Sequence, residues 1–288
     1  MRCDLHVHTR NSGMCGVPLL SRICRESYND PQAVYETLKQ RGMELVTVTD
    51  HDSIDAVEPL RSYPDFFLSE EVTCTTPSGT KIHLGVYGID EKHHKELQRR
   101  RNDLLSLTSY LNEHTLFSSI NHVFSCLTGR RTDHDFAFFE RFIPGVETMN
   151  GHMPASSNRS AAELARRWRK AAVGGSDSHT LAGLGYTYTD VPSAIGVESY
   201  LIGLKRGRSK VGGTSGDYLK LTRAVVEIGF EMTGEIDWAT ALTPLLLAVP
   251  LVTLFSYVSE IIFADQWARR VMYEGSLARV LYLPRSAE

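Results

Sequence analysis

Histidine and carboxylate residues follow several short apolar segments of this chain. His6 and His8 stand two positions apart near the start, and Asp177 and His179 repeat that spacing later. Residues two positions apart on a strand point to the same side. Further residues of these types stand in comparable places: Asp50, His51, Glu71, His83 and His122. Neutral imidazoles and carboxylates together bind divalent ions such as zinc, manganese or iron(II), so the pattern predicts a metal site.

Short β-branched segments alternate with helical patterns over about residues 1–212, which predicts an α/β domain. Strands are expected at residues 2–8, 45–49, 82–89, 118–121, 146–149 and 173–175, and helices at 30–42, 91–112 and 157–170. The first helix has Asp30 as its cap and Pro31 at its first position. In barrel-like α/β folds the strand ends converge on one face, so we expect the strands to gather the histidines there.

Each short motif taken alone has an ordinary structural explanation. A His-x-His pair is more often a core or surface feature, and Asp50-His51-Asp52 is also typical of a turn with a helix cap. Repetition of the arrangement at five strand ends, in chain order, is what favours a metal site over these explanations.

The composition is that of an ordinary folded protein. The 288 residues are 42% hydrophobic and 23% charged with a formal net charge of −3, which excludes a disordered chain and a strongly basic protein that coats nucleic acid. Five cysteines without a CxxC pair favour a reducing compartment over a disulfide framework. No apolar run follows Met1, so we expect no secretory signal and a cytoplasmic location.

Five motifs resemble, in order and spacing, those of the PHP (polymerase and histidinol phosphatase) domain family. They are Asp4-Leu5-His6-Val7-His8-Thr9, Thr49-Asp50-His51-Asp52, the Glu71…His83 pair, Asn121-His122 and Gly175-Ser176-Asp177-Ser178-His179-Thr180. The resemblance covers about residues 1–210. It implies a distorted (β/α)7 barrel with a di- or trinuclear metal centre that hydrolyses phosphoesters.

The resemblance implies two metal ions that share one carboxylate. The ligands of the first ion would be His6, His8, Glu71 and Asp177. The ligands of the second would be Glu71 as a bridge, His83 and His122. The divalent ions expected are Mn, Zn, Fe or Mg.

A third ion would be held by His51, His179 and a ligand from the loop after His8. This loop departs from the family pattern, which usually places Asp or His there, because it offers Asn11, Met14 and Cys15 instead. A methionine is a poor ligand for hard ions, so the third position has the least complete ligand set.

For catalysis we expect His51 and His179 to bind phosphate or to protonate the leaving group. Asp50 is expected to orient a histidine, and Arg10 to contact phosphate as a bidentate donor. The resemblance implies nucleotides or nucleic-acid 5′ ends as substrates, as in a 5′–3′ exonuclease. Two alternatives are kept: a histidinol-phosphate-type phosphomonoesterase, and a catalytically weakened, membrane-associated binding or regulatory module.

Residues 213–288 are predicted to form a helical extension that follows a glycine-rich linker at 212–216. Its segment 242–263 is apolar except for Glu260, and Pro250 is expected to kink it. Its uncharged part, residues 242–259, has 18 residues, which is borderline for a span that needs ~20, and Arg269 and Arg270 behind it would place the catalytic domain outside the cell. Two alternatives therefore stay open. The segment lies on the inner face of the membrane, or it packs on the domain or in a homo-oligomer contact.

Overall fold

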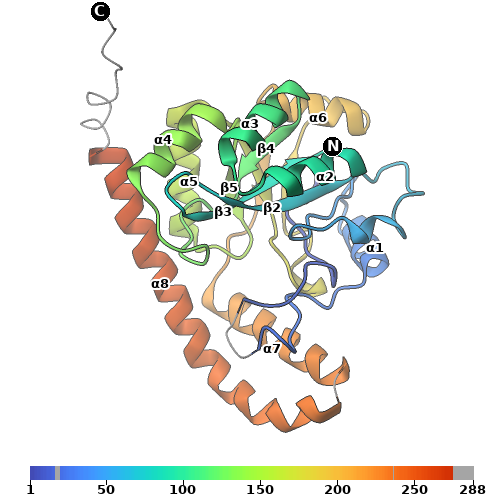
Figure 1. The fold of residues 1–288 in the computed structure, drawn as a ribbon. Helices are drawn as coiled ribbons and strands as arrows, with labels where there is room; N and C mark the ends of the chain where they lie inside the picture. The colour runs from blue at the N-terminus through green and yellow to red at the C-terminus, as the bar shows by residue number, and fades with distance from the viewer. Residues whose placement is uncertain (17–19, 236, 275–288) are drawn as a thin grey trace, which may run out of the picture.

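The computed structural model describes residues 1–16, 20–235 and 237–274 and has a mixed α/β fold (Figure 1). The larger sheet has five strands: β2 (Ser69–Thr75), β3 (Lys81–Tyr87), β4 (Phe117–Ile120), β5 (Gly145–Asn150) and β6 (Ala171–Gly175), in that order. Strands β2, β3 and β4 are antiparallel neighbours, whereas β4, β5 and β6 are parallel. A smaller antiparallel sheet has the order β1 (Arg2–Cys3), β7 (Thr187–Asp190) and β8 (Lys210–Gly213).

Helices cover the larger sheet, and two more lie beside and below it (Figure 1). They are α1 (Pro31–Gln40), α2 (Glu91–Arg100), α3 (Leu104–Glu113), α4 (Asp133–Phe142), α5 (Ala155–Trp168), α6 (Val197–Lys205), α7 (Tyr218–Glu235) and α8 (Val249–Arg269). Short helical elements are η1 (Asp55–Val57), η2 (Leu181–Gly183), η3 (Asp237–Ala248) and η4 (Arg270–Glu274). The main hydrophobic core lies between the five-stranded sheet and helices α2 to α5.

The predicted α/β class is confirmed, but a complete (β/α)7 barrel is not shown, because the described sheet is not closed. Between β6 and β2 lie two extended segments, residues 4–8 and 45–51, joined by separate backbone hydrogen bonds. The Asp177 amide donates to the His6 carbonyl at 2.7 Å, the Thr49 amide to the Val7 carbonyl at 2.8 Å, and the Asp52 amide to the Glu71 carbonyl at 3.0 Å.

Side-chain hydroxyls explain why these two segments are not regular strands as predicted. Thr49 Oγ1 accepts from the Val7 amide at 2.9 Å, and Thr47 Oγ1 donates to the Phe67 carbonyl at 2.7 Å. Both threonines are buried, and their hydroxyl groups make hydrogen bonds that backbone groups would make in a regular β-ladder. Each segment is therefore held in place without continuous strand pairing.

Two other predicted elements differ from the structure. The helix expected at 91–112 is broken at residues 101–103, where the Asp103 carboxylate caps α3 by accepting from the Ser106 amide. Gly212 and Gly213 are not a free linker, because they pair with β7 as part of β8. The start of α1 is confirmed, with the Asp30 carboxylate accepting from the Gln32 amide at 2.9 Å.

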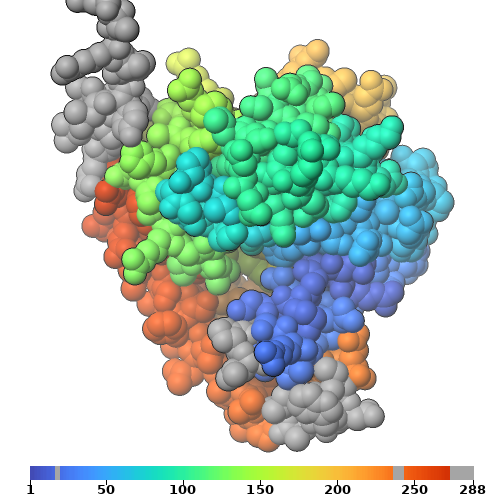
Figure 2. Space-filling view, in the orientation of Figure 1, coloured from blue at the N-terminus to red at the C-terminus, as the bar shows by residue number. Residues whose placement is uncertain are grey.

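Helix α8 docks on the α/β domain only through its second half. Ala264 and Ala268 are buried in the main core, and the Trp267 ring stacks on Phe136 of α4 at 5.3 Å. The predicted kink at Pro250 is wrong, since this proline occupies the first turn of α8, where its missing amide costs no hydrogen bond. In Figure 2, the red and orange atoms of α8 run along the left border of the molecule.

The first half of the apolar segment is exposed. Leu247 is 86% exposed, Leu251 72% and Phe255 77%. Within the described residues, one helical stretch, Thr243–Met272, is long and apolar enough to cross a membrane, with a mean hydropathy of 2.0 and 17% burial in its most apolar window. Length and composition alone are weak evidence of a span, so the membrane alternative stays a prediction.

Helix α7 packs against the loop that precedes α1. Met232 of α7 and Cys24 of the loop are buried together, and Arg25 Nε donates to Glu235 Oε2 at 3.2 Å. The helical extension thus lies against the segment that carries the predicted third-metal ligand.

Candidate metal centre

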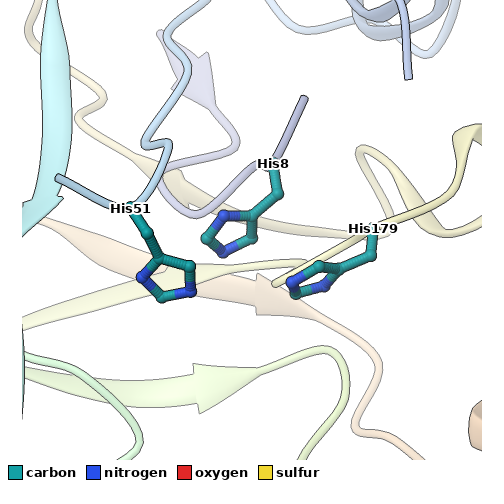
Figure 3. Close-up of side chains that lie close together, drawn as sticks. All are labelled: His8, His51 and His179. Carbon is teal, nitrogen blue, oxygen red and sulfur yellow. The ribbon is translucent and has the colours of Figure 1, made fainter. Parts of the chain in front are cut away.

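The structure brings all eight predicted metal ligands together. His6, His8 and His51 come from the two extended segments, Glu71 and His83 from the β2–β3 hairpin, and His122, Asp177 and His179 from the turns after β4 and β6. Their ligand atoms form four overlapping groups, each within 4.8 Å: His8, His51 and His179; His6, His8 and Asp177; His6, Glu71 and His122; His51, Glu71 and His83. Figure 3 shows the rings of His8, His51 and His179 turned toward one another.

Glu71 lies at the centre of the cluster and is fully buried. Its Oε1 atom is 3.3 Å from His122 Nε2 and 3.4 Å from His83 Nδ1. Its Oε2 atom is 3.1 Å from His6 Nε2 and 3.5 Å from His8 Nε2. Each carboxylate oxygen therefore faces one of the two predicted ligand sets, which is the arrangement that a bridging ligand needs.

Asp177 joins the first set from the other side. Its Oδ1 atom is 3.3 Å from His8 Nε2 and 3.4 Å from His6 Nε2. Its Oδ2 atom accepts from Asn150 Nδ2 at 2.9 Å, so one oxygen is fixed by an amide and the other is left toward the histidines.

Glu26 supplies the carboxylate that the residues directly after His8 do not provide for the third position. Its two oxygens lie 3.5 Å from His51 Nε2 and 3.6 Å from His179 Nε2. The loop reaches this point because it folds back on itself, with the Glu26 amide donating to the Gly13 carbonyl at 3.1 Å and the Cys15 amide to the Cys24 carbonyl at 3.0 Å. Glu26 therefore lies beside the short stretch where the family pattern places its ligand.

The other ring nitrogen of three histidines is held by a hydrogen bond. His6 Nδ1 donates to Glu147 Oε1 at 2.7 Å, and His179 Nδ1 donates to the Asp177 carbonyl at 3.0 Å. Ser12 Oγ donates to Asp50 at 2.8 Å, so its oxygen accepts from His8 Nδ1 at 2.8 Å. Each of these bonds favours the tautomer whose Nε2 lone pair points into the cluster.

Asp50 thus acts on His8 through Ser12 and not by direct contact. Both of its oxygens are occupied, since Thr9 donates to it through its amide and its hydroxyl, each at 2.6 Å. Burial raises the pKa of Asp50, while the Thr9 and Ser12 hydrogen bonds oppose that rise. Its predicted orienting role is consistent with this geometry.

The donor atoms fit divalent ions. Several buried ring nitrogens have no hydrogen-bond partner among the described residues: His8 Nε2, His51 Nδ1, His83 Nδ1, His122 Nδ1 and His179 Nε2. Burial, together with neighbouring histidines, lowers the pKa of His8 to about 3, so its ring is neutral. The neutral His8 Nε2 atom lies 3.3 Å from Asp177 Oδ1 and 3.5 Å from Glu71 Oε2, and a cation between these atoms would stabilise the arrangement.

The charges of the buried carboxylates in the cluster also favour a bound cation. Burial disfavours a charged His6, yet the charges of Asp177, Glu71 and Glu147 raise its pKa well above the ordinary value. Burial would raise the pKa of Glu71, yet the surrounding histidines, first His6, hold it well below the ordinary value. The cluster therefore attracts positive charge, which protons or metal ions can provide.

Backbone strain occurs at two of the predicted ligands. His122 has φ 27° and Asp177 has φ 52°, in the left-handed region that non-glycine residues rarely adopt. Such strain gathers at sites where the surroundings fix a side chain for function. A side chain at Gly175 would overlap the backbone of His6, so glycine is what lets β6 approach the first extended segment.

The predicted arginine contact and the loop candidates lie elsewhere. Arg10 is half exposed and paired with Asp30 at 3.1 Å, so its phosphate contact stays a prediction. Met14 is exposed and pairs with Arg25 through its backbone. Asn11 Nδ2 donates to Thr9 Oγ1 at 3.4 Å.

Sequence reasoning missed Glu26 and the supporting side chains Glu147, Ser12 and Asn150. Glu147 carried a weak signal, because it lies in the short strand segment before Asn150-Gly151 and is 2% exposed. Its second oxygen accepts from the His122 amide at 2.7 Å, so it positions two predicted ligands at once. For Glu26 no local motif exists, because only the fold of the loop brings it to His51 and His179.

Comparisons with known proteins agree with this fold. A search of curated proteins finds no match, whereas a family model described as PHP-associated matches residues 155–208. PsfC from Pseudomonas syringae PB-5123 superposes with a TM-score of 0.57 at 15% identity, over 82% of this chain and 98% of its own. The lesion-specific endonuclease PfuEndoQ from Pyrococcus furiosus gives 0.51 at 15% identity, over 73% of this chain and 58% of its own. At this identity the two structures show a shared fold.

Proposed function

We propose that the chain, which a PHP-associated family model matches over residues 155–208, is a metal-dependent phosphoesterase of the PHP-domain family. The observation that carries the proposal is the cluster of eight predicted ligands and Glu26, in which unpartnered imidazole nitrogens face buried carboxylates. The first ion would be held by His6, His8, Glu71 and Asp177. The second would be held by Glu71, His83 and His122, and the third by His51, His179 and Glu26.

Divalent ions in such a site neutralise the charge that develops on a phosphoryl group and lower the pKa of water toward about 7. The chain's own contribution is orientation. Glu147 fixes the His6 ring and the His122 backbone, and the Ser12–Asp50 pair fixes the ring of His8. A second layer of buried hydrogen bonds therefore holds the ligands in place before substrate arrives.

His179 is proposed to hold a proton for the leaving group when the third position carries no ion. Burial alone would lower its pKa, but the Glu26 carboxylate and Asp177 raise the pKa of His179 to about 9. At neutral pH the ring is then protonated at Nε2, 3.6 Å from Glu26. With an ion in place, the same nitrogen would be one of the ligands that hold it, together with His51 and Glu26.

The substrate class is proposed to be nucleotides or nucleic-acid 5′ ends, with histidinol-phosphate-type monoesters as the alternative. The net charge of −3 is consistent with substrates that are bound locally. An assay over phosphorylated metabolites, nucleotides and 5′-phosphorylated oligonucleotides separates the two groups. Turnover of oligonucleotides at comparable or higher kcat/KM supports the first, and turnover of small monoesters alone supports the second.

The proposed reaction is tested by removing metals with a chelator and adding Mn²⁺ back before the assay. We expect activity to vanish and return, and His8→Ala and Asp177→Ala to be inactive at every Mn²⁺ concentration. As a matched control, His134→Ala, which replaces a histidine of α4 outside the cluster, should keep the wild-type rate. Activity that survives metal removal, or wild-type rates in the His8 variant, would contradict the proposal.

We also propose that the exposed half of the apolar segment rests on the inner face of a membrane. Residues 242–259 carry no charge, and Leu247, Leu251 and Phe255 are exposed. Because the second half of α8 is docked on the domain, the exposed apolar stretch is shorter than the ~20 residues that a membrane span needs. These features support an interfacial position over a span, and a contact between two copies of the chain is the competing outcome.

A further inference from the structure

Lys220, in the first turn of α7, has a buried ammonium group without a partner. Its Nζ atom is shielded from solvent and has no hydrogen-bond partner among the described residues. An ammonium group offers three donors and no acceptor, and buried charges are normally paired. An oxygen-rich acceptor is therefore the missing partner.

The two carboxylates whose charges act on Lys220 are already occupied. Asp217 Oδ1 accepts from the Lys220 amide at 2.8 Å. Asp4 is fully buried and accepts from the amides of Ser176 and Gly185, both at 2.8 Å. Burial lowers the pKa of Lys220, and the charges of Asp217 and Asp4 oppose that fall. Neither carboxylate makes a hydrogen bond to Nζ, so its donors have no partner among the described residues.

The chain before α7 is fixed against the turn that follows β5. The Gly216 amide donates to the Met153 carbonyl at 2.9 Å, and Asn158 Nδ2 donates to Ser215 Oγ at 3.0 Å. A side chain at Gly216 would overlap the backbone of His152, so the two segments are in direct contact. Lys220 follows Gly216 by four residues and lies in the first turn of α7.

His152 links this position to the metal cluster. Its ring is nearly parallel to that of His179, with centroids 5.9 Å apart and an interplanar angle of 18°. The charge of Lys220 also acts on His152, whose pKa burial lowers to about 4, with Asp177 opposing and His179 and Lys220 adding to the fall. The Lys220 charge is thus close enough to act on a buried histidine whose ring stacks on that of His179. In Figure 1, α7 lies below the larger sheet.

We propose that Lys220 and His152 form an anion subsite that binds a phosphate group of the substrate next to His179. The subsite deepens the phosphoesterase function proposed above and rests on it. A phosphate oxygen is a strong acceptor that satisfies an ammonium, and an imidazole ring adds an N–H donor. The helical extension, outside the motifs of the family, would then supply a substrate contact.

Binding of inorganic phosphate to the Mn²⁺-loaded full chain, measured by isothermal titration calorimetry, tests this proposal. We expect Lys220→Gln to weaken phosphate binding by about tenfold or more, and Lys220→Arg to restore most of it. Arg223→Gln is the matched control, because Arg223 lies on the same helix, exposed and paired with Glu227 at 2.7 Å, and should bind phosphate as the wild type does.

Kinetics provide the second readout. Lys220→Gln should raise KM for the preferred phosphoester by a similar factor and change kcat less, because the contact is made to bound substrate. Wild-type phosphate affinity in Lys220→Gln, or equal losses in Lys220→Gln and Arg223→Gln, would overturn the subsite. Circular dichroism checks that each variant folds, and Lys220→Met replaces Lys220→Gln if the latter does not.

Failure of the subsite and failure of the proposed function give different results. If the chain hydrolyses no phosphoester but binds phosphate in a Lys220-dependent way, the subsite stands and the enzymatic proposal falls. If the chain is an active phosphoesterase whose KM and phosphate affinity do not change when Lys220 is substituted, the enzymatic proposal stands and the subsite falls.

Discussion

Glu260 is the one charged residue within the apolar segment 242–263, and it determines how α8 is held. Its side chain is 4% exposed, and its Oε1 atom accepts from Ser125 Oγ and the Cys126 amide, each at 3.1 Å, and from Cys126 Sγ at 3.0 Å. Burial and the Glu260 carboxylate raise the pKa of Cys126 to about 12, so its thiol stays a donor. The Ser125 amide in turn donates to the His122 carbonyl at 2.8 Å, which ties this contact to a predicted metal ligand.

We predict that Glu260→Gln lowers the free energy of unfolding by about 2 kcal/mol. A hydrogen bond to a charged acceptor contributes ~1.5–3 kcal/mol, and glutamine keeps one acceptor oxygen while its amide N–H faces a donor. For a domain of this size, about 2 kcal/mol corresponds to a fall in Tm of about 4–8 °C. The loss should be larger for Glu260→Ala, which leaves three buried donors without an acceptor.

Thermal unfolding followed by circular dichroism measures the change. The control is Asp265→Asn on the same helix, whose exposed pair with Arg269 at 2.8 Å should contribute less than about 0.5 kcal/mol. A Tm for Glu260→Gln within about 1 °C of the wild type, or equal to that of Asp265→Asn, would refute the view that this buried carboxylate anchors α8.

Three further predictions concern the loop, the strand contact and the apolar surface. In metal-free protein, Glu26→Gln should lower Tm most between about pH 4.5 and 6.5. The reason is that the pKa of His179 is raised to about 9 and that of Glu26 is lowered to about 2, so their ion pair stabilises the fold in this range. The Tm difference between the wild type and the variant should fade as pH rises through 9. A Tm difference that stays constant with pH would contradict this reason. Gly175→Ala should weaken metal affinity by about tenfold or more because its Cβ would displace His6, whereas Gly196→Ala, with open space around it, should bind metal as the wild type does; equal affinities in the two variants would refute this reason. Phe255→Glu should abolish co-sedimentation with anionic vesicles, whereas a wild-type chain that ignores vesicles and elutes as a dimer would show that this surface contacts a second copy.

The histidine cluster could be predicted because its information is local. His-x-His spacing places two side chains on one side of an extended segment, and a histidine or carboxylate directly after a short apolar segment lies at a strand end. His6, His8, Asp177 and His179 follow this rule, and they lie together in the structure. The rule does not need the sheet to close, which explains why the cluster could be expected although the complete barrel is not shown.

Contacts that depend on long-range folding could not be predicted. Glu26 reaches His51 only because the loop after His8 pairs with itself, and no spacing along the sequence encodes that. The segment 45–49 looked like a strand because of its composition, but the buried hydroxyls of Thr47 and Thr49 replace backbone partners there. Likewise, the hydropathy pattern indicates one continuous apolar segment. In the structure, the part of α8 after Glu260 is docked on the domain and the part before it is exposed.

The central claim, that the clustered side chains hold divalent ions, is tested most directly by counting metal. Chain purified without chelator and dialysed against Mn²⁺ or Zn²⁺ should contain two or three ions by mass spectrometry of the digested protein. His8→Ala, Glu71→Gln and Asp177→Ala should each lose at least one ion, while Arg223→Gln, outside the cluster, should lose none. Fewer than two ions in the wild type, or an unchanged count in the Glu71 variant, would contradict the account.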